Sequence, residues 1–232
     1  MGLLEETYYF LTKDLRYEVV EPNPGPYPVW PFIQMYDSQD LHWWNGDRLA
    51  PTKPVDFTAL EGTPQDEASF ARMKVASTHR GPLLRDALAD IVRPFAPADA
   101  QFIPSYIKTD RGPFEFEEGW HFLHLWKLRD LVDDAKSARY TLRNGKVRNR
   151  YDQIVLKEDE VLAIPESERL ILRVASLDTI VMIFHRQVVD AMLSFGIDGA
   201  LFLPLSLYRV GPVLRPETLE VGWSTKAVHK KQ

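Results

Sequence analysis

Two phrases of the chain, at 79–107 and 185–207, share one pattern of apolar positions. Each opens on His-Arg, passes through Asp-Ala-Leu or Asp-Ala-Met, and reaches an apolar run with Phe-Ile-Pro or Phe-Leu-Pro. Apolar residues first recur at steps of three and four, as on one face of a helix, and then follow one another as in a strand. The pattern predicts two repeated helix-strand units that lay both helices on the same sheet.

The first phrase predicts a helix over 81–92 and a strand over 100–107. Pro82 is tolerated in the first turn of a helix, and Pro104 places the strand at an edge or a bulge. The apolar stripe of this helix consists of Leu83, Leu84, Ala87, Leu88 and Ile91.

The second phrase predicts a helix that ends before Gly196 and a strand over 200–208. Glycine is the usual residue after a helix because it adopts positive φ without strain. The apolar stripe of this helix consists of Val188, Val189, Met192 and Leu193, with Phe195 at its end.

Further strands are predicted where aromatic and β-branched residues gather. They lie at 7–14, 16–21, 55–60, 119–128 and 169–176. Asn144-Gly145 stands between two strand-like runs within 138–156, and this pair predicts a hairpin with a type I′ turn. Five prolines between Pro22 and Pro31 predict an extended loop, because proline lacks an amide donor.

The whole pattern predicts an α+β fold. We expect a single domain over 1–222, because no composition break or linker divides the chain. Its sheet is expected to be mostly antiparallel or mixed, with a basic β-hairpin and the two helix-strand units. Residues 223–232 are polar and predict a flexible tail.

Composition excludes several classes of protein. The 232 residues contain no Cys, so disulfides, thiolate metal sites and cysteine nucleophiles are absent. The longest apolar runs fall far short of the ~20 residues of a membrane span. The first ten residues lack the basic and apolar regions of a secretion signal, so we expect a cytoplasmic protein. The formal net charge of −5 is mild, and any electrostatic argument must come from local clusters.

The histidines are the first candidates for chemistry. His121 and His124 have a spacing that binds metal from a helix, but on a strand they point to opposite faces. His79 and His185 stand at predicted helix starts, where a polar residue is usually solvated. No nucleophile, phosphate-loop or zinc-protease motif accompanies them. We therefore predict no enzyme activity, no cofactor and no metal, with a hydrolase using His79 or His185 as a distant alternative.

Charged and aromatic clusters are candidates for binding. The acidic run Glu115, Glu117 and Glu118 precedes Trp120 and predicts a face for a basic partner, although such runs also form solvated turns. Trp43 and Trp44 are either core residues or interface anchors. The hairpin gathers six basic residues among Tyr140 and Tyr151, which suits either nucleic-acid contact or protection of a strand edge. These basic residues are Lys136, Arg139, Arg143, Lys146, Arg148 and Arg150.

The order of several phrases adds a resemblance to a family. The phrases are YYFLTKD, HRGPLLRDAL with DAQFIPSYI, LVDDAKS, ILRV and VVDAMLSFGIDGALFLPL. Their order resembles the bacterial immunity-protein family first described as domain of unknown function 1629, the eleventh immunity family of polymorphic toxin systems. The resemblance covers about 60–208, and the proline-rich stretch and basic tail depart from it. Its most specific residues are Asp133, Ser137, Gly196, Gly199, Phe202 and Pro204.

The resemblance implies a cytoplasmic antidote that binds a protein toxin encoded by an adjacent gene and neutralises it by stoichiometric occlusion. It implies no catalysis, and it names neither the toxin nor the oligomeric state. The residues that we expect to contact the toxin are Glu115, Glu117, Glu118, Trp120, Trp43 and Trp44. The alternative is an RNA- or single-strand-binding module that uses the basic hairpin 136–150, although we expect no nucleic-acid partner.

Overall fold

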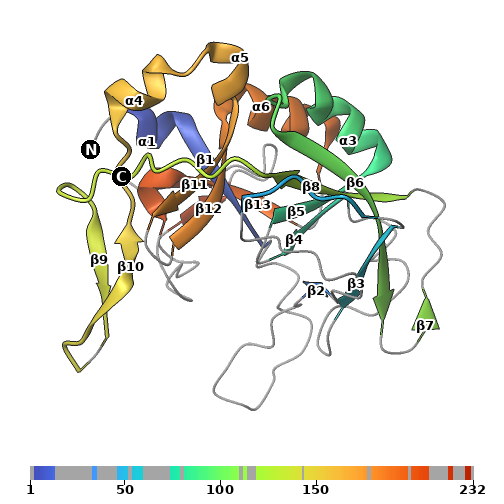
Figure 1. Cartoon of the computed structure of the whole chain (residues 1–232), viewed down its shortest axis with the longest axis horizontal. Coiled ribbons are helices and arrows are strands. Elements are labelled where there is room, and N and C mark those ends of the chain that lie inside the picture. Colours follow the sequence, from blue (N-terminus) through green and yellow to red (C-terminus); the bar gives the residue numbers. More distant parts are fainter. Residues whose placement is uncertain are drawn as a thin grey trace.

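Two β-sheets lie next to each other, and helices α3 and α6 cover one side of both (Figure 1). The structure is a computed structural model of the chain and describes residues 3–13, 33–35, 46–51, 54–59, 74–78, 81–109, 112–113, 119–142, 144–176, 179–197, 200–208, 219–221 and 228–230. The predicted α+β fold is confirmed. In this part of the chain, no helix is long and apolar enough to span a bilayer.

The helices are short. They are α1 (Leu3–Thr7), α3 (Asp86–Val92), α4 (Glu158–Ala163), α5 (Glu166–Arg169), α6 (Arg186–Phe195) and the 3-10 helices η2 (Arg93–Phe95) and η3 (Leu205–Leu207). The strands are β1 (Tyr8–Lys13), β2 (Ile33–Met35), β3 (Val55–Ala59), β4 (Val75–Thr78), β5 (Gly81–Arg85), β6 (Ala100–Thr109), β7 (Gly112–Pro113), β8 (Trp120–Leu125), β9 (Ala138–Thr141), β10 (Val147–Gln153), β11 (Ile171–Ser176), β12 (Thr179–His185), β13 (Ala200–Pro204), β14 (Leu219–Val221) and β15 (Val228–Lys230).

One sheet has four antiparallel strands in the order β11-β12-β1-β13. The other has the order β3-β2-β4-β5-β8-β6-β7, and β3 also pairs in parallel with β6. Because of that additional pairing, six strands close into a ring, which we call the six-strand ring (β3, β2, β4, β5, β8 and β6). Its inside is filled by a separate core that includes Phe57, Trp120 and Phe122.

The two repeated phrases build the same supersecondary structure. In the first, β5 and β6 both pair antiparallel with β8, and α3 connects them. In the second, β12 and β13 both pair antiparallel with β1, and α6 connects them. Each is a split β-α-β unit with one strand inserted in the middle. We call them the β8 unit and the β1 unit.

The units also match in detail. The residue before each helix lies opposite an aromatic residue of the middle strand: Arg85 faces Trp120, and His185 faces Tyr8. Further on, Phe102 and Phe202 both pack toward the helices. The duplicated phrase therefore predicts a real structural repeat. The expectation of a single shared sheet is wrong, since each helix follows the strands of its own sheet.

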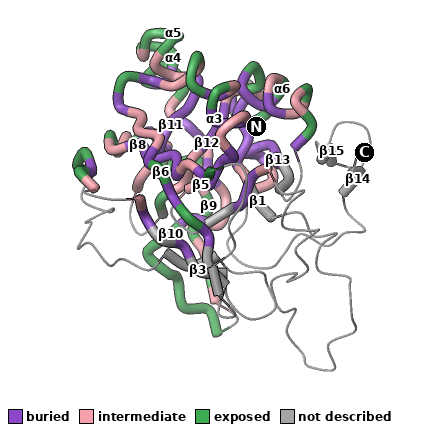
Figure 2. The backbone as a smooth tube through the Cα atoms, turned by 90° about the vertical axis from the view of Figure 1, so that its right-hand side faces the viewer, coloured by how far each residue is buried: buried purple, intermediate pink, exposed green. Residues whose placement is uncertain are grey.

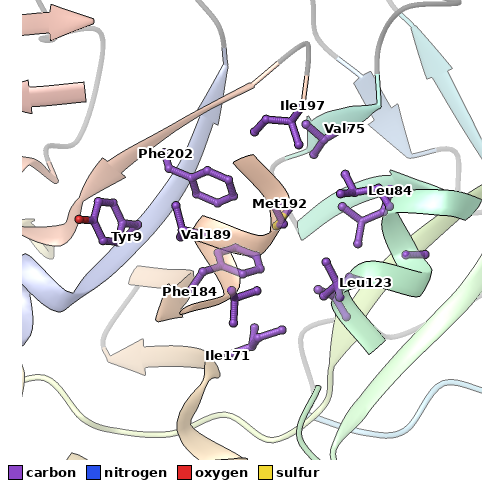
Figure 3. Close-up of a cluster of buried hydrophobic side chains, with 14 of the residues drawn as sticks. Tyr9, Val75, Leu84, Leu123, Ile171, Phe184, Val189, Met192, Ile197 and Phe202 are labelled. Carbon is purple, nitrogen blue, oxygen red and sulfur yellow. The ribbon is translucent and has the colours of Figure 1, made fainter. Parts of the chain in front are cut away.

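A shared core nevertheless joins the two sheets (Figure 3). It contains Leu88 of α3 and Met192 of α6, together with side chains from both sheets such as Leu123 and Phe184. All four side chains are fully buried. A second core lies on the opposite face of the four-stranded sheet and is covered by residues from 131–161. The sheets are thus held together mainly by the layer of side chains under α3 and α6.

The predicted helix over 81–92 is wrong in its first half, because Gly81–Arg85 forms strand β5. Leu83 packs inside the six-strand ring and Leu84 packs under the helices, so both neighbours in the sequence are buried. A strand covered on both faces places apolar residues side by side, and this imitates the stripe of a helix. Pro82 lies in the strand and not in a helical turn.

Most other predicted elements are confirmed. Strands β1, β3, β8 and β11 lie within the expected ranges, β6 extends two residues beyond its expected end, and α6 ends at Phe195 with Gly196 as its C-cap at φ of 79°. Pro104 lies where β6 has only β8 as a partner in the described part, because the pairing with β3 begins at Ser105. The predicted strand 16–21 and the predicted loop 22–31 lie outside the described residues. Val228–Lys230, in the expected tail, pairs with Leu219–Val221.

Candidate functional site: a clamped basic hairpin

Strands β9 and β10 form a two-stranded sheet of their own that projects from the body of the protein (Figures 1 and 2). Residues 144–150 are all exposed, and Val147 has an exposed fraction of 55%. An isolated two-stranded hairpin is at best marginally stable in water. A hairpin that is exposed on this scale must therefore be stabilised at its base.

The turn of the hairpin differs from the predicted type I′ turn. The amide of Gly145 donates to the carbonyl of Leu142 at 2.8 Å, and Gly145 has φ of 80°. The amide of Lys146 donates to the side-chain oxygen of Asn144 at 3.1 Å. This is the pattern of a turn from Leu142 to Gly145 that ends in a left-handed glycine. Asn-Gly predicts the hairpin correctly, but the turn closes one residue earlier than expected.

The base of the hairpin is held by the phrase that contains Asp133 and Ser137. The amide of Asp133 donates to the carbonyl of Val155 at 2.8 Å. The hydroxyl of Ser137 donates to the same carbonyl at 3.3 Å, and it accepts from the Val155 amide at 2.9 Å. These contacts tie the residues before β9 to the residues after β10. We call them, with Asp134, the hairpin clamp.

Asp134 adds the side-chain part of the clamp. Its Oδ1 accepts a hydrogen bond of 2.7 Å from the hydroxyl of Tyr151, whose side chain is buried. Its two oxygens also accept from Nη2 of Arg139 at 3.0 and 3.1 Å. The bond from Tyr151, followed by the bond from Arg139, lowers the pKa of the Asp134 carboxyl. The carboxylate therefore stays ionised well into mild acid and keeps the two strands together.

The clamp divides the basic residues of the hairpin into two groups. Lys136 pairs with Asp133 at 2.9 Å, and Arg139 pairs with Asp134, so both charges are compensated. Within the described part of the chain, Lys146, Arg148 and Arg150 have no carboxylate at ion-pair distance. Val147 lies between Lys146 and Arg148 in the sequence and is also exposed, and we call the four residues the hairpin tip.

The aromatic residues of the hairpin are not available for stacking on a base. Tyr151 is 1% exposed, and its hydroxyl donates a hydrogen bond to Asp134. Tyr140 is half-buried, and the guanidinium of Arg150 lies over its ring at 5.0 Å from the centroid. Stacking on aromatic side chains contributes ~1–3 kcal/mol per base in single-strand binding proteins. The geometry therefore removes the aromatic half of the pattern that suggested nucleic-acid binding.

The other expected contact residues are not brought together here. Glu115, Glu117, Glu118, Trp43 and Trp44 lie outside the described residues. Trp120 is 2% exposed inside the six-strand ring, and the guanidinium of Arg85 lies 4.7 Å from its ring centroid. The binding role of Trp120 stays a prediction, and contact with a partner requires the indole to leave this position.

The histidine pair of β8 lies on opposite faces of the strand, as predicted. Nδ1 of His121 lies 2.9 Å from Oδ1 of Asp86, on the side of the helices. His124 faces the inside of the ring, where Nε2 contacts the carbonyl of Asp47 at 3.1 Å. Burial lowers the pKa of His124 to about 4; the Asp47 carbonyl opposes this shift and the charge of Arg173 adds to it. His124 is neutral near pH 7.

The remaining histidine candidates offer no site in the described part of the chain. His79 lies outside it. His185 caps α6, since Nδ1 accepts from the amide of Gln187 at 3.3 Å, and burial lowers its pKa. Among the described residues, no three His, Asp or Glu side chains are grouped as metal ligands. The clamp was the part of the site that the sequence did not identify, although LVDDAKS contains Asp133, Asp134 and Ser137.

Comparison with known proteins assigns no family to this chain. No model of a protein family matches it, and no curated protein matches it. The membership in the immunity-protein family therefore stays a prediction that rests on the order of the phrases.

Proposed function

We propose that this protein is an immunity-type antidote that binds a protein toxin encoded by an adjacent gene and neutralises it by stoichiometric occlusion. The observation that carries the proposal is the clamped hairpin, because it combines a rigid base with a tip that is exposed on all sides. An exposed, preorganised element loses little conformational entropy when it binds. The two units and the six-strand ring act as the scaffold that holds it.

The resemblance to the immunity family supports the same proposal from a different direction. Its most specific residues in the middle of the chain, Asp133 and Ser137, belong to the hairpin clamp. These side chains stabilise the base of the projecting hairpin and hold its direction, and a binding element requires both. We also propose that this protein is located in the cytoplasm, where the toxin acts.

Co-purification tests the proposal. The tagged protein and the product of the adjacent gene are expressed together, and we expect a complex of fixed stoichiometry that protects cells against that product. If the two proteins fail to associate and the protein gives no protection, the antidote function is refuted.

A shortened variant tests whether the hairpin carries the binding. Replacing 140–150 with Asn-Gly joins Arg139 to Tyr151 through a two-residue turn. These two residues are already paired in the register of β9 and β10. The clamp is retained, so the thermal midpoint should change little, while association and protection should be lost. Full binding by the folded, shortened protein places the interface on another surface, where Glu115, Glu117, Glu118, Trp43 and Trp44 are the next residues to test.

A further inference from the structure

We infer that the hairpin tip recognises an acidic protein surface, with Lys146, Arg148 and Arg150 as its cations and the exposed Val147, which lies between two of them in the sequence, as an apolar contact. This inference rests on the proposed function and specifies the chemistry of the partner. It reverses the charge expected from the acidic run at 115–118, which suggested a basic partner.

The charge of the tip is opposite to that of the chain as a whole. The formal net charge of the protein is −5, yet the tip presents three cations that no described carboxylate compensates. A local patch of opposite sign attracts an acidic partner and orients it during the encounter. The other two described cations of the hairpin, Lys136 and Arg139, form ion pairs with Asp133 and Asp134 of the clamp.

Arg150 is the best-positioned of the three cations. Its guanidinium lies over the ring of Tyr140, which restricts the plane of the group while its N–H donors stay at the edge. A guanidinium that is held in one plane can receive a carboxylate through two parallel hydrogen bonds. Lysine at this position would keep the charge but lose that geometry.

Val147 favours a protein over a nucleic acid or a second copy of this chain. It is an aliphatic side chain exposed on 55% of its surface, with a cation before and after it in the sequence, and an exposed apolar group next to cations suits a protein surface that offers both apolar and acidic groups. Three phosphate contacts would give a slope of only about −3 in log affinity against log salt, so nucleic-acid binding would be weak at physiological salt. Two tips from two copies would repel each other.

Binding of defined polymers tests the inference without any knowledge of the partner. The probes are a fluorescent copolymer of Glu and Tyr, which combines carboxylates with apolar groups, and single-stranded poly-uridine RNA of equal charge; phosphatidylglycerol vesicles are a third. At physiological salt we expect the copolymer to bind more tightly than poly-uridine or the vesicles.

Matched variants assign the binding to the tip. Arg148→Glu should weaken copolymer binding by about tenfold or more, whereas Lys127→Glu, which makes the same charge change at another exposed cation, should alter it less than about twofold. Arg150→Lys should weaken it although the charge is kept, and Val147→Ser should weaken copolymer binding but not RNA binding.

Three outcomes would overturn the inference: tighter binding of poly-uridine or vesicles than of the copolymer, equal losses in Arg148→Glu and Lys127→Glu, or no binding of the copolymer. The result also separates this inference from the antidote function. If the adjacent-gene product does not associate but the copolymer binds through the tip, only the antidote function fails. If that product binds Arg148→Glu as tightly as the unchanged protein, only the acidic-surface inference fails.

Discussion

The β8 unit and the β1 unit have one topology but secure their helices in different ways. In the β1 unit, α6 has ten residues, begins at the capping residue His185 and ends at Gly196 in the left-handed conformation. In the β8 unit, α3 has seven residues, the residue before it, Arg85, provides no side-chain cap, and the chain continues directly into a 3-10 helix.

The difference shows where each helix obtains its stability. Helices of this length are marginal alone, so both depend on the shared core. The β1 unit adds local hydrogen bonds at both ends of its helix. The β8 unit instead relies on buried contacts of its strands, such as Arg85 against Trp120 and the filled inside of the ring. One architecture is thus supported by local signals in one copy and by tertiary packing in the other.

The largest expected effect tests whether the two helices share one core. Leu88→Ala and Met192→Ala both remove fully buried side chains, and each should lower the free energy of unfolding by roughly 2–5 kcal/mol. Leu193→Ala is the control, because this side chain is only half-buried, and its cost should be clearly smaller. Urea denaturation measures all three. A small effect at one of the two buried positions would mean that the units are stabilised independently.

The second effect is specific to the β8 unit and depends on pH. Because the pKa of His124 is about 4 in the folded protein and near 6.5 ordinarily, the unfolded chain binds more protons between these values. Stability is therefore fully present above pH ~6.5 and is lost as pH falls toward 4, by roughly 2–3 kcal/mol at ~1.4 kcal/mol per pKa unit.

His124→Gln isolates this contribution, since glutamine does not titrate and its amide can still donate to the Asp47 carbonyl. The difference between the unfolding free energies of the two proteins should change across this pH window. A constant difference from pH 7 to pH 4 would contradict the prediction. In the β1 unit, Thr12 occupies the position four residues after Tyr8, as His124 follows Trp120, so this position of the β1 unit does not titrate.

The third effect concerns the end of α6. Gly196→Ala introduces a Cβ at φ of 79°, where no atom of the described residues lies within 4 Å, so we expect mainly backbone strain. We expect a loss of about 1 kcal/mol. Ser194→Ala, at an exposed position of the same turn, should be neutral or slightly stabilising. Equal midpoints for the two variants in thermal unfolding would show that the left-handed residue is not needed.

The smallest effect concerns the start of α6. His185→Ala removes the capping nitrogen and the edge-on contact with the ring of Tyr8, while His185→Asn removes only the ring and keeps an acceptor. The difference between the two variants should be about 0.5–1 kcal/mol, with Ala the less stable. If both variants unfold at the same denaturant concentration, the cap does not distinguish the two units.

The sequence predicted the elements whose signals are local. Helix α6 combines a clear stripe with a terminal glycine, and the hairpin has Asn-Gly between two strand-like runs. The division between β5 and α3 was missed because Leu83 and Leu84 are buried on opposite faces. That arrangement depends on pairing with β8, which lies more than thirty residues further along the chain, as well as with the adjacent β4.

The same limit applies to the closure of the ring and to the candidate site. The pairing of β3 with β6 joins residues about fifty positions apart, and no local pattern specifies it. The sequence alone shows that the hairpin is basic. The contacts of Asp133 and Asp134, which only the structure shows, determine which of the cations are compensated. Asp133 and Asp134 belong to a turn in the sequence. They act as a clamp only because the hairpin folds back and brings its side chains next to them.

The position of β1 in the middle of its sheet sets an order of events during synthesis. Both of its partners, β12 and β13, lie far along the sequence, since Tyr8 pairs with His185 and Tyr9 pairs with Pro204. The β8 unit needs only residues between Gly81 and Leu125, which leave the ribosome before β12 and β13. Strand β1 therefore waits without these two partners until the residues up to Pro204 have been made, and closing so long a loop is slow. A nascent chain of this protein carries a finished β8 unit beside an apolar N-terminal strand that is still open to chaperones.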